Sequence, residues 1–199
     1  GTVETQLDSM NVEGVPLGRL RAGAHLADGM LHVDSASLLT AAGIARASGS
    51  LGLVDGRTGR LEAGYISESI TPFEELVFGA ATGNGEPRLA GRVDALVTLD
   101  GWIGAFAVDG RLRGDDVVYD GTRANSASFE LAANWAGGDG ITAFRLAGRS
   151  DSLTAMSHTM QLARLDVSGR PDSMHVALAG EAAGQQTLLA DAEVERDVE

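Results

Sequence analysis

The sequence predicts an all-β protein, built as an elongated antiparallel meander with one short helix near residues 72–78. Three observations predict this fold. Apolar and polar residues alternate with a period of two in many short segments, which is the pattern of a strand with two different faces. Asp-Gly pairs, which favour tight hairpins, recur between these segments. Only one segment carries the start and stop signals of a helix.

The alternating segments place apolar side chains on one side of each predicted strand. They occur at residues 20–26, 31–33, 51–53, 61–65, 93–99, 106–112, 129–131, 144–146, 174–178 and 188–194. Residues 37–47 contain several alanines that suit a helix, but Gly43 and the flanking alternation favour a pair of strands. Together these segments predict roughly a dozen strands joined by short turns.

Six Asp-Gly pairs predict the turns, because both residues tolerate a positive φ. They are Asp28-Gly29, Asp55-Gly56, Asp100-Gly101, Asp109-Gly110, Asp120-Gly121 and Asp139-Gly140. The pair Asp109-Gly110 lies inside an alternating run, where a β-bulge is the alternative to a turn.

The helix signal lies where the two halves of the meander meet. Thr71 is expected to cap the helix, Pro72 to occupy its first turn, and Glu74 to complete a capping box. Gly79 is placed to end the helix, and a loop is expected to follow it up to Arg88. The chain therefore divides near residues 67–90.

Composition and charge exclude several classes of function. The net charge is -13 at pH 7, and the 15 basic residues are scattered singly, so the sequence predicts no nucleic-acid partner. Cysteine and lysine are both absent, which excludes thiol and Schiff-base chemistry. No recognised catalytic, phosphate-binding or dinucleotide-binding motif is present. We therefore expect no enzyme, no cofactor and no metal.

Some polar and aromatic residues still invite a functional interpretation. His25 and His32 face each other across a predicted hairpin as possible metal ligands, although two solvent-facing residues are the favoured interpretation. Asp115 and Asp116 resemble an acidic metal pair, but a polar turn is favoured. Trp102 and Trp135 suit either packing or stacking on a sugar. Three further features are given no role in chemistry: His158, His175 and the loop at residues 137–140.

The apolar side of the strands is the feature with the clearest functional implication. Aromatic residues make up only 5% of the chain, so small side chains leave room for an open groove, although a filled sandwich is the alternative. Such a groove shelters acyl chains at about 25 cal/mol per Å² of covered apolar surface. The expected lining residues are Leu20, Leu26, Val97, Phe106, Val108, Phe129, Leu131, Phe144, Leu146, Val176 and Leu178.

Two stretches resemble a known family. Leu26 to Asp34 follows the hairpin pattern L-x-x-G-x-L-x-V-D, and the glycine-rich strand Gly49-Ser50-Leu51-Gly52-Leu53 comes after it. The units at residues 108–121 and 124–131 are similar to strand units of the same group. In these features the chain resembles the AsmA-like/TamB family, in which TamB is the inner-membrane component of the translocation and assembly module.

The resemblance implies a curved β-taco, in which a long sheet folds around an apolar groove. It divides the chain into an AsmA-like repeat at 1–66, a helix and loop at 67–90, and TamB-like strands at 91–199 that continue the same sheet. It also implies a periplasmic scaffold that transports phospholipid between the inner and outer membranes and takes part in outer-membrane biogenesis, protein secretion and assembly.

The implied partners are phospholipid acyl chains and an outer-membrane β-barrel assembly protein. No apolar run is long enough to cross a bilayer and Gly1 is not an initiator methionine, so we interpret the chain as an internal piece of a longer protein. An anchor in the inner membrane is then expected outside it. The alternative function is a sandwich or repeat module of a secreted protein that mediates adhesion or binds carbohydrate.

Overall fold

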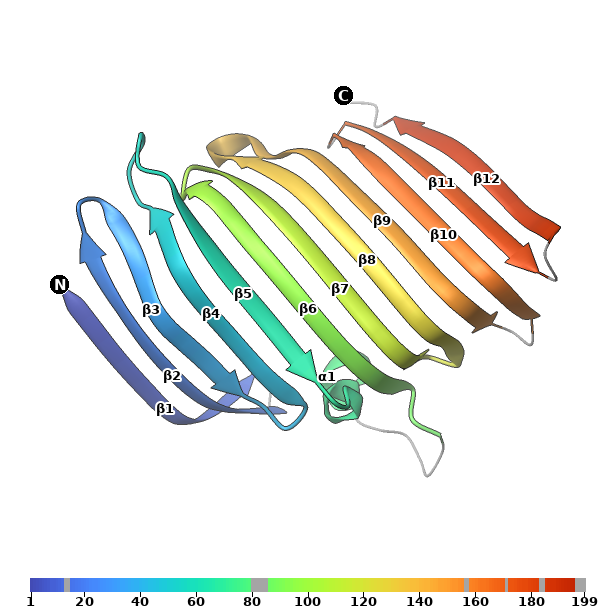
Figure 1. Ribbon diagram of the computed structural model, residues 1–199, viewed down its shortest axis with the longest axis horizontal. Helices are drawn as coiled ribbons and strands as arrows, with labels where there is room; N and C mark the ends of the chain where they lie inside the picture. Colours follow the sequence, from blue (N-terminus) through green and yellow to red (C-terminus); the bar gives the residue numbers. More distant parts are fainter. Residues whose placement is uncertain (13–14, 80–85, 156–157, 171, 183–184, 196–199) are drawn as a thin grey trace.

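A computed structural model of the chain shows one open antiparallel sheet of twelve strands (Figure 1). The structure describes residues 1–12, 15–79, 86–155, 158–170, 172–182 and 185–195. Each strand pairs with the next one along the chain, and β1 and β12 form the two opposite edges of the sheet (Figure 1). The predicted all-β meander of about a dozen strands is confirmed.

The strands are long, at 9 to 16 residues each. Their bounds are β1 (Thr2–Val12), β2 (Val15–Ala27), β3 (Met30–Leu39), β4 (Gly43–Gly52), β5 (Gly59–Ser67), β6 (Leu89–Trp102), β7 (Ala105–Tyr119), β8 (Thr122–Ala136), β9 (Gly140–Ala155), β10 (His158–Arg170), β11 (Ser173–Ala182) and β12 (Gln185–Glu195). Residues 37–47, where a helix was the alternative, form the end of β3, a short turn and the start of β4.

Two of the predicted Asp-Gly turns are two-residue hairpin loops. Asp28-Gly29 joins β2 to β3 with φ of 50° and 74°, and Asp120-Gly121 joins β7 to β8 with φ of 46° and 83°. Positive φ at both central residues is the geometry that matches the right-handed twist of the flanking strands. Asp55-Gly56 and Asp139-Gly140 also lie at connections, but these connections are longer.

The other two Asp-Gly turns were predicted wrongly. Asp100-Gly101 lies inside β6, where it pairs with Ala107 and Phe106, and the chain reverses only after Trp102. Asp109-Gly110 lies inside β7 and pairs with Thr98 and Val97 without a register shift, so it is neither a turn nor a bulge. The alternation on both sides of each pair extends the strand through it, and this tertiary pairing overrides the local preference for a turn.

Asp115 and Asp116 do not form the predicted polar turn either. They lie inside β7, where the register with β6 shifts between Ala90 and Arg92. Asp116 has a φ of 51°, so the aspartate pair belongs to an irregularity within a continuous strand.

The predicted helix is present as a one-turn 3₁₀ segment, η1 (Thr71–Phe73), followed by α1 (Glu74–Phe78). Gly79 ends it with a φ of 77°, as predicted. The predicted capping box is wrong. Thr71 lies inside η1, and the residue at the N-cap, Ile70, makes no side-chain capping hydrogen bond.

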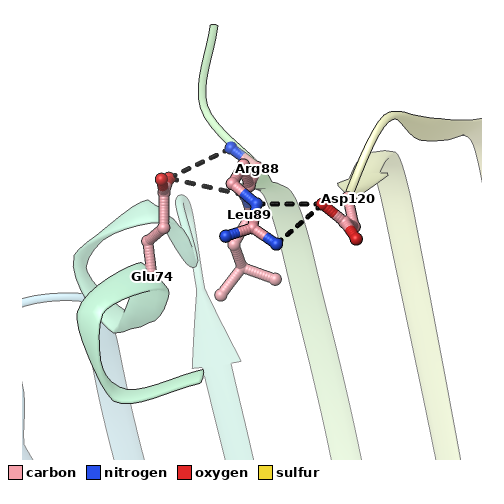
Figure 2. A network of polar contacts seen from close by, with 4 residues as sticks. All are labelled: Glu74, Arg88, Leu89 and Asp120. Atoms are coloured by element: carbon pink, nitrogen blue, oxygen red, sulfur yellow. Dashed lines mark hydrogen bonds and ion pairs between the residues drawn. The ribbon is translucent and has the colours of Figure 1, made fainter. Parts of the chain in front are cut away.

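Glu74 instead binds the chain that returns to the sheet. Its Oε2 atom accepts hydrogen bonds from the backbone N–H groups of Arg88, at 3.2 Å, and Leu89, at 3.5 Å (Figure 2). The Arg88 guanidinium pairs with Asp120 at 2.8 Å (Figure 2). It also lies 4.1 Å from the centroid of the Phe78 ring. These contacts fix the helix to the start of β6 and the end of β7.

The helical segment does not interrupt the sheet. β5 and β6 pair directly, from Gly59 opposite Gly101 to Ser67 opposite Val93. Part of the loop expected up to Arg88, at residues 80–85, lies outside the described residues.

Replacing Glu74 by glutamine is expected to loosen the helical segment without disturbing the sheet. A neutral amide forms weaker hydrogen bonds to the two backbone N–H groups than the carboxylate does. Hydrogen exchange followed by mass spectrometry should show faster exchange at residues 72–79 and unchanged exchange in β8 to β10. Glu75→Gln, at an exposed neighbouring position, is the control and should leave both regions unchanged. Equal effects of the two substitutions would contradict the anchoring role of Glu74.

The described part of the sheet has a very thin core. Among these residues the buried apolar residues are Ala42, Leu89, Ala124 and Ala163. No second sheet is packed on either face of the described strands. Cohesion therefore comes from backbone hydrogen bonds and from cross-strand side-chain pairs, and apolar surface is left accessible on one side.

Candidate functional site

One face of the sheet is apolar from the first strand to the last. Paired residues of adjacent strands lie on the same face, so the register defines rows of side chains that cross the sheet. We call one of them the Leu20 row. Its members are Leu7, Leu20, Leu38, Ala45, Tyr65, Ala95, Leu112, Phe129, Gly148, Leu165, Leu178 and Ala190. The Tyr65 hydroxyl is the only polar side-chain group in this row.

A second row lies beside it on the same face, two residues further along each strand. We call it the Ala22 row. Its members are Thr5, Ala22, Ala36, Ala47, Ala63, Val97, Gly110, Leu131, Leu146, Val167, Val176 and Ala192. The two rows and the apolar residues that flank them are called the apolar face below.

Side-chain size varies along the apolar face. From β2 to β5 the Ala22 row contains only alanine, whereas from β8 to β11 it contains leucine and valine. The small residues leave a hollow of about 340 Å³, lined by Leu20, Leu38, Ala45, Ala47, Ala63, Tyr65 and Val97, among others. The sheet therefore has a shallow apolar depression in its first half and a flatter apolar surface in its second.

All eleven residues predicted to line a groove lie on this face. Val97, Leu131, Leu146 and Val176 belong to the Ala22 row, and Leu20, Phe129 and Leu178 belong to the Leu20 row. The remaining four flank the rows. Val108 and Phe144 both pair with Ala133, Phe106 pairs with Trp135, and Leu26 pairs with Leu31.

Several members of the two rows are not among the lining residues that the sequence predicts. Leu165 and Val167 of β10 were missed, although they alternate with Arg164 and Asp166 in the expected way. Ala45 and Ala47 are also absent from the predicted lining, because the hollow results from small side chains whereas the predicted residues are large. The signal that identifies them is their register opposite Leu38 and Ala36, which requires the structure.

The apolar face is open to solvent. Large side chains on it remain partly exposed, for example Val97 at 37%, Leu131 at 40% and Leu26 at 53%. The only element packed against it in the described chain is the helical segment, through ring contacts of Phe73 with Tyr65 and of Phe78 with Tyr119. A contiguous exposed apolar surface of this extent is typical of a binding surface.

The opposite face is polar and carries ion pairs between neighbouring strands. Arg60 pairs with Asp100 at 3.3 Å and Arg145 with Asp166 at 2.8 Å. His175 forms a hydrogen bond of 2.8 Å with Asp191. The hydrogen bond to Asp166 raises the pKa of Arg145 above its usual value. All of these side chains are well exposed, so the pairs align neighbouring strands and contribute little to stability.

The histidines considered as metal ligands do meet across the hairpin of β2 and β3. The rings of His25 and His32 stack at 4.7 Å, and His25 Nδ1 lies 3.1 Å from Asp34 Oδ2. Within the described ranges, no group of three or more His, Cys, Asp or Glu side chains is arranged to hold a metal ion.

The two tryptophans lie on opposite faces of the sheet. Trp135 is on the apolar face, stacked on Phe106 with ring centroids 6.0 Å apart. Trp102 follows Gly101 in β6, and Gly101 is paired with Phe106 on the apolar face, so Trp102 points to the polar side. They therefore do not form one sugar-binding platform together.

Comparison of the chain with protein-family models, with curated proteins and with solved structures finds no match. Among the described residues, no helix has the length and apolar character needed to cross a bilayer.

Proposed function

We propose that the chain is a non-catalytic lipid-binding scaffold, whose apolar face provides a path for phospholipid acyl chains. The observation that supports this proposal most directly is the apolar face, whose two rows cross all twelve strands and whose large side chains stay partly accessible to solvent. Each methylene group that moves from water onto such a surface contributes up to about 0.8 kcal/mol. A single acyl chain spans several strands, which lie about 4.8 Å apart.

The wider role that we propose is transport of phospholipid across the periplasm between the inner and outer membranes, in outer-membrane biogenesis. In this role the parent protein is anchored in the inner membrane and works with an outer-membrane β-barrel assembly partner. Support comes from the hairpin and strand motifs at residues 26–34 and 49–53, which resemble the AsmA-like/TamB family, and from the long open meander that contains them.

Bound lipid is the direct test of this proposal. The chain is expressed in a Gram-negative host, exported to the periplasm, purified without detergent and analysed by native mass spectrometry and by lipid extraction. We expect phospholipid in the purified protein, and uptake of a fluorescent phospholipid from vesicles by protein that has been stripped of lipid. Protein that is empty after purification and takes up no lipid from vesicles would contradict the proposal.

A further inference from the structure

The polar face contains an apolar island that breaks the alternation. Leu39, Ile44 and Ile66 follow one another across β3, β4 and β5 on this face, and Leu96 of β6 lies beside them. Ile66 is 57% exposed and Leu39 is 51% exposed. Large apolar side chains on the solvated side of a sheet depart from the alternation of apolar and polar residues, and such departures are expected at functional sites.

A hollow of about 450 Å³ lies over this island. Its lining residues are Ile44, Arg46, Gly64, Ile66, Asp94, Ala95, Leu96, Arg111 and Arg113. The register explains the hollow, because Arg46 of β4 and Arg111 of β7 belong to one row that continues through Gly64 and Leu96. Gly64 has no side chain, so the floor is low between the two arginines.

The arginines at the rim have no ion-pair partner in the part of the chain that the structure describes. Arg113 lies directly opposite Asp94, and Arg111 directly opposite Glu130, yet neither pair lies within ion-pairing distance. The lining set holds three arginines and one aspartate, so its formal charge is +2, in a chain whose net charge is -13. Guanidinium groups bind carboxylates and phosphates through paired hydrogen bonds.

The geometry points to a second binding site on the polar face, which takes an organic anion with an apolar tail. The anionic group, a phosphate monoester or a carboxylate, binds to Arg46, Arg111 and Arg113, and the tail lies on Ile44, Ile66 and Leu96. The adjoining hollow, of about 460 Å³, also contains Arg111, but there Asp109 and Glu130 add negative charge. This site is independent of the proposed function, because it lies on the face opposite the lipid path.

Hexyl phosphate is a suitable probe, because it carries both an anionic group and an apolar tail. Inorganic phosphate, which has no tail, and hexanol, which has no anionic group, are the controls. Titration into the isotope-labelled chain, followed by NMR, should give saturable shifts at Ile44, Ile66 and Leu96. Hexyl phosphate should bind at least about tenfold more tightly than inorganic phosphate, because each buried methylene adds to affinity. Inorganic phosphate that binds as tightly as hexyl phosphate, or the absence of saturable shifts at the island, would overturn the assignment.

Single and combined substitutions can show that hexyl phosphate binds at this site and not on the apolar face. Combined Arg46→Gln, Arg111→Gln and Arg113→Gln should weaken hexyl phosphate binding by at least about tenfold, as expected for the loss of charge-assisted hydrogen bonds. Arg164→Gln, on the same face but outside the hollow, should leave the affinity unchanged. Gly64→Leu should also weaken binding by filling the floor, since the Cβ atom at this position meets only ordinary contacts with Ala95 and Leu96. Leu146→Glu, on the apolar face, should leave the affinity for hexyl phosphate unchanged. If the triple arginine variant bound hexyl phosphate as tightly as the original chain, the proposal would be overturned.

Discussion

Glutamate at position 108 or 146 is expected to abolish the retention of phospholipid while leaving the sheet folded. Val108 and Leu146 lie on the apolar face of β7 and β9, where a bound acyl chain would cover them. In the free protein this face is open, so the new carboxylate stays largely hydrated and the free energy of unfolding changes little. Under a bound acyl chain the same carboxylate loses its water without gaining a partner, at a cost of several kcal/mol.

The expected loss of affinity is large, since each 1.4 kcal/mol corresponds to a tenfold change in the dissociation constant. Fluorescent phospholipid uptake measures the effect, and urea unfolding confirms that the variants remain folded. Arg164→Glu is the matched control, because it introduces the same residue on the polar face of β10 between Arg149 and Ala179. If Arg164→Glu impaired uptake as strongly as Leu146→Glu, the apolar face would not be the lipid path.

Alanine at position 52 is expected to destabilise the whole sheet. Gly52 ends β4 at the point where that strand passes the end of β5 and contacts Trp102 of β6. A Cβ atom there would overlap the carbonyl oxygen of Arg57 and lie 2.8 Å from the Cβ atom of Trp102. The backbone has to shift, which breaks the hydrogen bond from the Ile103 N–H to the Gly52 carbonyl. We expect a loss of about 2 to 3 kcal/mol in the free energy of unfolding.

Gly64→Ala is the control for this substitution. Its Cβ atom would lie 3.6 Å from the Ala95 carbonyl oxygen, an ordinary contact, and Gly64 does not adopt a positive φ. Because glycine inside a strand is less stable than alanine, this change should raise stability by about 0.5 kcal/mol. Equilibrium unfolding in urea compares the two variants. A neutral Gly52→Ala would show that the end of β4 is not closely packed against β6.

The strand count and the two-sidedness of the sheet were predictable from the sequence, because alternation extends over almost every strand. Leu20 to Leu26 and Val93 to Leu99 each assign their face without any knowledge of a partner strand. Local signals failed where tertiary pairing outweighs them. Asp109-Gly110 has the sequence of a turn, but its neighbours on both sides pair in register with β6.

The site was only partly predictable for the same reason. Leu131 and Leu146 were assigned to the apolar face from their own segments, but their position in one row with Val97 depends on the register of four successive strands. The apolar island on the polar face was not predicted at all. Ile44 and Ile66 lie next to each other only because β4 pairs with β5 in one particular register. The sequence pattern within either segment does not indicate that register.

The helical segment covers part of the apolar face at β5. Phe73 lies against Tyr65, with ring centroids 6.3 Å apart, so an aromatic ring of the helical segment covers the Leu20 row at β5. The Ala22 row crosses β5 at Ala63 instead, which lies two residues, or about 7 Å, along the strand from Tyr65. In the proposed function, we therefore expect acyl chains to cross β5 along the Ala22 row, where the small alanine side chains leave room for them.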